Sequence, residues 1–553
     1  MKKIIVLAIL ILLAACGPRE DTAVSTTPST PHIQNISRAA AGTLYSTIDQ
    51  LAANQPTGNQ PAINLLIAAN VIAWLGLLLF IWRTRRQLGV SRWAWQVAGG
   101  VLVMIVLATA VYLFTSLQNT PPTAPLESTT SLADRLAQAG AIPPLQLSAA
   151  ANTEVELGRA LFWDPILSGN KDIACVTCHH PNEGTGDGLP LPIGTGGQGL
   201  GPTRVLLPTA RQILVPRNAT PIYNLGLDGM DVLFWDGRVS VTPDGQFNSP
   251  ANDDTPHNLA NAIAVQAMFP VTSRDEMRGH SGDNDIFGER NSLGTIQDHQ
   301  FTLMWEGLMA DVLAVPAYQE LFQAAYPSVP LDELTFAHAA NALAAYQMDT
   351  FTFLDSPWDR YLQGDETALS PEALAGAELF YGEAGCASCH SGSLLSDMQF
   401  HNIGVPQIGP GKGNEAPLDF GRARETSSDS DLFAFRTPPL RNVAITGPWM
   451  HNGAYNSLEV VIRHHLNPQE AVANYDFGQL SPLVLAEDSG DTAVHTAALN
   501  APSFGMPTRE LTNAEIAALI AFLESLTSPT VLDLSHTIPD SVPSGLPVGG
   551  AIN

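Results

Sequence analysis

The chain has 553 residues, of which 45% are hydrophobic, and its 26 basic and 53 acidic side chains give a net charge of −27. Five cysteines are too few for a disulfide scaffold, the negative charge argues against a nucleic-acid binder, and the hydrophobic content excludes a wholly disordered chain. A chain of this length that can bury sizeable cores is expected to form two or three domains.

The N-terminal segment predicts export from the cytoplasm. Residues 1–16, MKKIIVLAILILLAAC, begin with two lysines, continue with an apolar run and end in a sequence that resembles the lipobox of bacterial lipoproteins. This pattern predicts a signal peptide and lipidation at Cys16, and the alternative is an uncleaved signal anchor. Residues 17–60 are rich in Thr, Ser, Pro and Asn, which predicts a flexible extracytoplasmic tether.

Residues 61–117 predict a transmembrane helical hairpin. The stretches 62–82 and 94–117 carry no charge, and each is long enough to cross about 30 Å of hydrocarbon. The loop 83–92 between them holds four arginines, which places this loop in the cytoplasm and both ends of the hairpin outside. The alternative, a buried soluble hairpin, is disfavoured by two uncharged runs of this length.

Residues 118–553 hold 18 basic and 50 acidic side chains, a net charge of −32. This charge keeps the exported part away from anionic lipid headgroups and could steer a basic partner protein towards it. A merely soluble, acidic extracellular surface is the alternative and needs no partner.

The other four cysteines form two C-x-x-C-H motifs, at residues 175–179 and 386–390. Two cysteines at this spacing form thioethers with the two vinyl groups of a haem, and the following histidine is then held beneath the iron. Zinc and thioredoxin-like sites are the alternatives, but neither explains a following histidine twice. We therefore predict two covalently bound haem c groups, attached at Cys175, Cys178, Cys386 and Cys389 and ligated by His179 and His390.

The expected fold class is mainly α, with two c-type cytochrome-like haem domains packed together behind the signal and the hairpin. Apolar positions at helical spacing predict closing helices over 335–353 and 511–526. We predict a linker over residues 118–148, an N-terminal cytochrome c-like haem domain over 149–356, a C-terminal cytochrome c-like haem domain over 357–530 and a tail over 531–553.

Residues 150–530 resemble the bacterial di-haem cytochrome c peroxidase family, which includes the di-haem enzymes that mature methylamine dehydrogenase. Besides the haem motifs, the resemblance rests on LGRALFWDPILSG, FWDGRVS, FHNIGVP and FRTPPLRNVAITGPWMHNGAYNSLEVV. It implies that the His179 haem reduces hydrogen peroxide to water, while the His390 haem accepts electrons from an extracytoplasmic donor such as cytochrome c. The catalytic part is then expected in the periplasm or on the outer face of the cytoplasmic membrane.

The resemblance also implies roles for further residues. Trp235 matches the family's tryptophan between the haems, and Glu276 matches the acidic residue beside the peroxide site, where it would transfer a proton. Ordinary core packing is the alternative for Trp235, and an ion pair with Arg274 or Arg278 is the alternative for Glu276. A calcium site is implied at Asn218, Thr446 and Pro448.

The chain departs from the family at the distal side of the first haem. Many members cap this iron with a histidine, in a segment where this chain has Thr195 and no histidine. This predicts an iron that is open or water-bound at rest. Three other histidines could substitute, although a surface or core role is favoured for each of them, namely His180, His257 and His280.

At the distal side of the second haem the family uses methionine or tyrosine, and this chain has His465 with His464 beside it. Adjacent helical residues point about 100° apart, so only one of the two can face the iron, and we choose His465. Two histidine ligands predict a lower potential than a histidine and a methionine. The alternative is a different ligand and a solvated histidine pair.

Two other functions remain as alternatives. One is a di-haem oxidase that acts on a partner protein or an organic molecule; the missing histidine at Thr195 fits it, but the absence of a tyrosine at position 465 argues against it. The other is a non-catalytic di-haem electron carrier with both irons six-coordinate. No nucleic-acid partner is expected, and a homodimer is one option for the oligomeric state.

Overall fold

The computed structural model describes residues 131–147, 150–208, 211 and 214–550. All of them belong to one compact unit, Leu126–Asn553. The predicted signal with Cys16, the tether and the transmembrane hairpin lie outside the described residues. Within the described ranges, every helix is either too short or too polar to span a bilayer.

The described part is mainly helical, as predicted, and its strands are only two or three residues long. They form three small antiparallel sheets. One pairs β1 with β2, the second has the order β3-β4-β5, and the third pairs β6 with β7. Their bounds are β1 Gly197–Gln198, β2 Val205–Leu206, β3 Val232–Leu233, β4 Val239–Val241, β5 Phe247–Asn248, β6 Phe400–His401 and β7 Phe435–Arg436.

The first apolar core is built around the crossing of two helices, α6 (Asn152–Trp163) and α11 (Phe336–Thr350). A Cβ atom on Gly158 of α6 would lie 1.9 Å from the carbonyl oxygen of Ala342 in α11, so only glycine allows this approach. Three further helices complete this core, α8 (Ala262–Ala267), α9 (Phe301–Leu313) and α10 (Pro316–Ala325).

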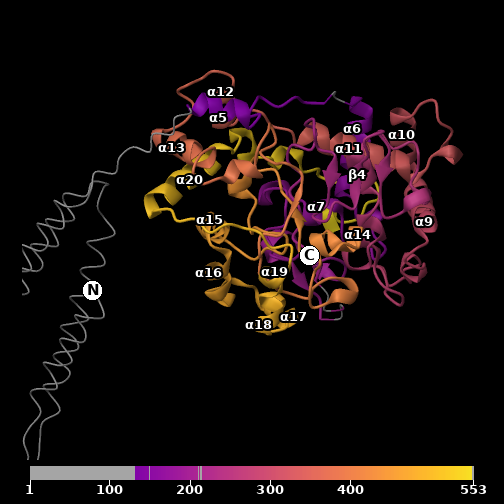
Figure 1. Cartoon of the computed structure of the whole chain (residues 1–553). Helices are drawn as coiled ribbons and strands as arrows, with labels where there is room; N and C mark the ends of the chain where they lie inside the picture. Colours follow the sequence, from indigo (N-terminus) through magenta and orange to yellow (C-terminus); the bar gives the residue numbers. More distant parts are fainter. Residues whose placement is uncertain (1–130, 148–149, 209–210, 212–213, 551–553) are drawn as a thin grey trace, which may run out of the picture. The chain divides into compact units, whose positions relative to one another are not determined.

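The second apolar core repeats this arrangement with α13 (Pro371–Phe380) and α20 (Asn513–Ser525). A Cβ atom on Gly376 would lie 1.9 Å from the carbonyl oxygen of Ala518. The predicted closing helices are thus present as α11 and α20, each packed on the helix that precedes a C-x-x-C-H motif. Figure 1 shows the two helix groups on either side of α7 (Cys175–Cys178).

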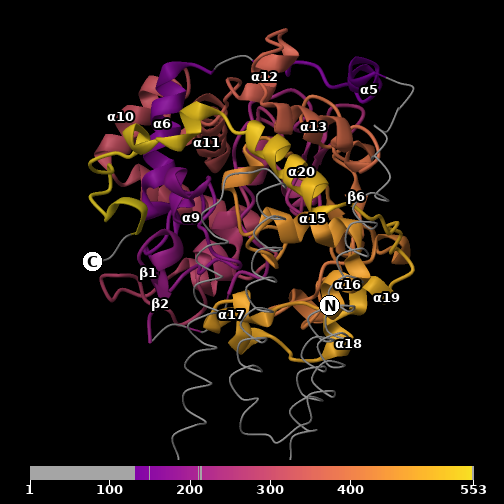
Figure 2. The same cartoon turned by 90° about the vertical axis from the view of Figure 1, so that its left-hand side faces the viewer.

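The remaining helices are short and mostly belong to the second half of the chain. They are α5 Leu132–Gln138, α12 Pro357–Leu362, α14 Ala423–Thr426, α15 Leu458–Leu466, α16 Pro468–Ala473, α17 Pro482–Glu487, α18 Thr492–His495 and α19 Ala497–Asn500. Figure 2 shows α15 close to α20, and α16 to α19 together below them.

The start of the described chain packs on the second half, and its end packs on the first half. Leu136 at the end of α5 belongs to the second core, whereas Val531 and Leu534 belong to the first. The hydroxyl of Thr177, inside the first cysteine motif, donates to the carbonyl of Gly549 over 2.8 Å. The segments predicted as linker and tail therefore carry packed residues that brace the two halves.

Candidate functional site

A cavity of about 430 Å³ is lined by residues from both halves of the chain. Both C-x-x-C-H motifs open into it, although they are more than two hundred residues apart in sequence. The cavity brings together every site residue that the sequence predicts within the described ranges: Cys175, Cys178, His179, Asn218, Trp235, Glu276, Cys386, Cys389, His390, Thr446, Pro448 and His465.

The histidine of the first motif is held in the orientation that a metal ligand needs. Nδ1 of His179 donates to the carbonyl oxygen of Thr185 over 3.1 Å, which leaves Nε2 free. Burial lowers the pKa of His179, so the ring is neutral and able to bind a metal ion. The short helix α7 that carries the cysteines is capped by a hydrogen bond from Ala174 N to the Thr177 hydroxyl.

The histidine of the second motif faces His465. Nδ1 of His390 donates to the Leu395 carbonyl over 3.1 Å, and Nδ1 of His465 donates to the Val461 carbonyl over 2.9 Å, so Nε2 is free in both rings. Their ring centres lie 6.4 Å apart. Two imidazoles on opposite sides of one metal ion, each bonded at about 2 Å, have centres roughly 6 Å apart. The pair could therefore hold one metal ion between its two rings.

His464 is unsuited to this role. Its Nδ1 accepts from the Tyr455 hydroxyl and its Nε2 donates to the Ile403 carbonyl, both over 2.9 Å. The ring is fully buried and does not line the cavity. The choice of His465 stays a prediction, and these contacts support it over the alternative of a solvated histidine pair.

Two arginines in the cavity wall are not fully paired within the described residues. Arg436 is 2% exposed, donates only to carbonyl and sulfur atoms of the described residues, and burial lowers its pKa to about 10. Arg441 binds Asp359, but its buried Nη2 has no partner in the described part. Since a buried unpaired cation is costly and each haem carries two carboxylates, these residues fit the two predicted haems.

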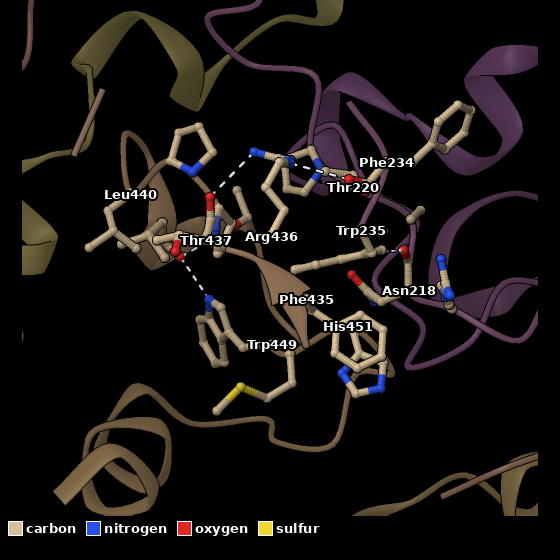
Figure 3. A pocket seen from close by; sticks show the side chains of 18 of the residues that line it. Asn218, Thr220, Phe234, Trp235, Phe435, Arg436, Thr437, Leu440, Trp449 and His451 are labelled. Atoms are coloured by element: carbon tan, nitrogen blue, oxygen red, sulfur yellow. Dashed lines mark hydrogen bonds between the residues drawn. The ribbon is translucent and has the colours of Figure 1, made fainter. Parts of the chain in front are cut away.

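Trp235 joins the two halves at the cavity (Figure 3). Its indole N–H donates to the Asn218 carbonyl over 2.9 Å, and its own carbonyl accepts from the Arg436 N–H over 2.8 Å. The side chain is 8% exposed and lines the cavity, yet it belongs to none of the three apolar clusters of the described residues. Ordinary core packing therefore describes it poorly.

Glu276 lies on a single π-helical turn, Arg274–Arg278, and lines the cavity. Its two neighbouring arginines, Arg274 and Arg278, both bind Asp298, so the alternative of an ion pair with Glu276 is not formed. Burial raises the pKa of Glu276, and this effect is opposed by the positive charges of Arg238 and Lys412. A carboxylate with a raised pKa in a cavity is suited to proton transfer.

None of the three substitute histidines lines the cavity. His180 accepts from the Asn182 N–H and packs on Trp163, His280 binds Asp275 over 3.1 Å, and His257 is exposed. The hydroxyl of Thr195 contacts the Arg274 carbonyl over 3.5 Å, outside the cavity lining.

The three predicted calcium residues line the same cavity. The side-chain N–H groups of Asn218 donate to the carbonyls of Leu189 and Pro190, so its side-chain oxygen is not used by these bonds. Thr446 donates its hydroxyl to the Val443 carbonyl over 3.1 Å. The arrangement leaves oxygen atoms of the kind that calcium binds, and the ion itself stays a prediction.

Sequence reasoning missed four polar residues near the motifs. Asp397 and His401 lie with Cys389 in a group whose potential ligand atoms are within 4.8 Å of one another. We interpret this group as part of the predicted second haem site, because haem attachment would use the Cys389 thiol. Arg436 and Arg441 belong to the motif FRTPPLRN. Only the fold shows that Arg436 has no carboxylate partner and that Nη2 of Arg441 has no partner among the described residues.

The chain is similar to several di-haem proteins. Residues 152–367 match the family model of the di-haem cytochrome c peroxidases. The cytochrome-c peroxidase IdrP1 of Denitromonas iodatirespirans is 30% identical over 388 residues, which cover 65% of this chain and 86% of that protein. The methylamine utilization protein MauG of Methylorubrum extorquens is 29% identical over 395 residues, 71% of this chain and 89% of that protein.

The cytochrome c551 peroxidase of Pseudomonas aeruginosa is 30% identical over 298 residues, 54% of this chain and 67% of that protein. Among solved structures, a MauG-like protein associated with microbial copper homeostasis is 25% identical, with a TM-score of 0.49 and coverage of 72% of this chain and 96% of that one.

Proposed function

Because the chain belongs to the di-haem cytochrome c peroxidase family, we propose that it reduces hydrogen peroxide to water with electrons from a second protein such as cytochrome c. The observation that carries this proposal is the composition of the cavity wall. Glu276 lines the cavity that His179 opens into, and the three histidines that could have capped this site, His180, His257 and His280, lie elsewhere.

The proposed chemistry divides between the haems and the side chains. When bound, the two haems supply the iron at which peroxide binds and the two electrons that its reduction needs. The Glu276 carboxylate takes a proton from one peroxide oxygen and returns it to the other, which leaves as water. Trp235 places an indole in the wall of the cavity that both cysteine motifs share, where it is suited to relay electrons.

The His390 and His465 pair sets the class of donor. Two histidine ligands give an iron a lower potential than a histidine and a methionine. We therefore expect a donor of lower potential than the usual high-potential cytochromes c. The net charge of −32 over residues 118–553 favours a donor with a basic surface.

We also propose that the enzyme is attached to a membrane and binds a calcium ion. Residues 1–117 carry the predicted lipoprotein signal with Cys16 and the predicted hairpin, which would fasten the catalytic part to the outer face of the cytoplasmic membrane. Calcium at Asn218, Thr446 and Pro448 would brace the cavity wall. A chelator would then lower the melting temperature, and added calcium alone would restore it.

Steady-state peroxide consumption tests the function. Purified protein is assayed with reduced cytochrome c and with a low-potential dye, with and without prior half-reduction. We expect turnover without prior half-reduction and a preference for the low-potential donor. Spectra with two low-spin irons that bind neither cyanide nor peroxide, even after half-reduction, would instead identify an electron carrier.

A second candidate is an oxidase that acts on a partner protein, which the similarity to methylamine utilization protein MauG favours. His465 stands against it, because the family's maturation enzymes have a tyrosine at this position. The two functions differ in the protein that is oxidised while peroxide is consumed. Peroxide consumed in step with oxidised cytochrome c supports the peroxidase, whereas peroxide consumption that depends on a non-haem protein from the same cell supports the oxidase.

A further inference from the structure

Lys412 is a cation of the cavity wall whose ammonium group has no hydrogen-bond or ion-pair partner among the described residues. The chain has four lysines, and only Lys171 and Lys412 fall in the described part. Lys171 binds Asp311 near the surface over 2.7 Å. Lys412 lines the cavity together with Glu276 and Arg238, and its ammonium group forms no hydrogen bond or ion pair with any described residue.

The loop that carries Lys412 is folded to present this side chain. The glycines on either side of it, Gly411 and Gly413, have positive φ angles of 70° and 64°. The N–H of Lys412 donates to the Leu418 carbonyl over 2.9 Å, and its carbonyl accepts from the Arg424 guanidinium over 3.0 Å. Because both backbone groups are bonded, the loop fixes the point and the direction from which the side chain leaves the backbone.

The loop is also anchored at its start. The Gly409 N–H donates to Asp488 over 3.2 Å, and Asp488 in turn binds His495 over 2.8 Å. A Cβ atom on Gly411 would lie 2.3 Å from the backbone carbon of Pro417, so the loop closes tightly on itself. A segment of the second half of the chain thus delivers a charge to the cavity that the first cysteine motif lines.

Among the carboxylates considered around Lys412, Glu276 is the one that no described arginine binds. Two carboxylates near it, Asp236 and Asp419, are both bound to Arg217 over 2.5 and 2.6 Å, and Asp236 also binds Arg238. Lys412 is one of the two cations that oppose the rise in the pKa of Glu276. Burial lowers the pKa of Lys412 to about 8, which still leaves most of it charged at neutral pH.

We propose that Lys412 is a second residue of the peroxide site and works together with Glu276; this inference rests on the proposed function. Glu276 moves a proton from one peroxide oxygen to the other. The ammonium group donates a hydrogen bond to the departing oxygen while the O–O bond breaks. Lys412 keeps its own proton: hydrogen peroxide takes two electrons from the donor and two protons from solvent and becomes two waters.

The test compares Lys412→Gln, Lys412→Met and Lys412→Arg with the wild-type protein, and Lys171→Gln serves as the matched surface control. In Lys412→Gln and Lys412→Met, kcat/KM for peroxide should fall roughly tenfold to hundredfold, the usual effect of losing a hydrogen bond to a charged group. Lys412→Arg should retain more activity, and Lys171→Gln should match the wild type.

Fluoride binding to the oxidised protein gives a readout that does not depend on turnover. Fluoride on the open iron accepts hydrogen bonds, so its Kd should rise roughly tenfold or more in Lys412→Met and little in Lys412→Arg. Haem absorbance and the potential of the second haem should stay the same in all variants, because Lys412 contacts none of the predicted ligands in the described part.

The outcomes separate the two proposals. If the wild type neither consumes peroxide nor binds fluoride, the proposed function fails and this inference fails with it. If the wild type does both and Lys412→Gln and Lys412→Met match it, only the role of Lys412 is overturned. If Lys412→Gln loses haem, the comparison of Lys412→Met with Lys412→Arg decides, since both keep a long side chain.

Discussion

Arg217 and Asp419 form a two-pronged ion pair across the middle of the molecule, with N···O distances of 2.6 and 2.8 Å. The two residues are 202 positions apart, and their side chains are only 6% and 5% exposed. Arg217 also binds Asp236 over 2.5 Å, and its guanidinium lies over the ring of Phe435. The pair therefore ties the two halves together beside the cavity.

Arg217→Met should destabilise the protein by about 3–5 kcal/mol, because it leaves the buried carboxylate of Asp419 without its ion-pair partner. Urea unfolding measures this change, with haem absorbance as a check on assembly. Glu459→Gln is the control, since Glu459 pairs with Arg463 at an exposed site and should cost about 1 kcal/mol or less. Equal effects of the two changes would contradict a structural role for the buried pair.

The same pair predicts a loss of stability in acid. Burial alone would raise the pKa of Asp419, but Arg217 holds this pKa below its ordinary value. The pair therefore stabilises the fold above the ordinary aspartate pKa of about 3.9, and the contribution is lost as the pH falls below this value. Unfolding followed from pH 6 to pH 2 should show this slope, and Asp419→Asn should flatten it.

His465→Met should raise the potential of the second haem on the order of 100 mV, because a methionine ligand favours the reduced iron. A redox titration followed by absorbance measures the shift. The first haem serves as the internal control, and its potential should change little. A titration with no shift at either haem would mean that His465 is not a ligand.

Glu276→Gln should keep both haems and slow peroxide turnover severely, since the amide cannot accept the proton. In the wild type, burial raises the pKa of Glu276, and the active form is the carboxylate. Activity should therefore fall as the pH drops through a value above the ordinary glutamate pKa of about 4.3. The acidic limb of the kcat/KM profile should be absent from Glu276→Gln, and an unchanged profile would exclude this residue from the mechanism.

Gly158→Ala and Gly376→Ala should each destabilise the protein by at least about 1 kcal/mol. The added methyl group would lie 1.9 Å from a carbonyl oxygen of the facing helix. Thermal unfolding measures both variants. Gly505→Ala is the control, since no heavy atom lies within 4 Å of the added carbon and its φ angle is not in the left-handed region. Stabilities equal to that of the control would mean that the helix crossings are loose.

The sequence by itself determined the local chemistry of the chain. The haem attachment sites follow from residues that are adjacent or three apart, as in Cys175, Cys178 and His179, so no fold is needed to recognise them. Helical periodicity likewise located α11 and α20. The two helices are confirmed, and the attachment sites stay a prediction; both rest on properties of short stretches of sequence.

Only the tertiary structure decided which distant groups meet. It placed the ring of His465, which the sequence already favoured over His464, 6.4 Å from the ring of His390. It also left Arg436 without a carboxylate among the described residues and brought Lys412 into the cavity with Glu276. The free-energy cost of burying a charge depends on the groups around it, and those groups come from segments hundreds of residues apart. The sequence therefore named the groups that are predicted to hold the haems, while the packing of the two halves set the charges around them.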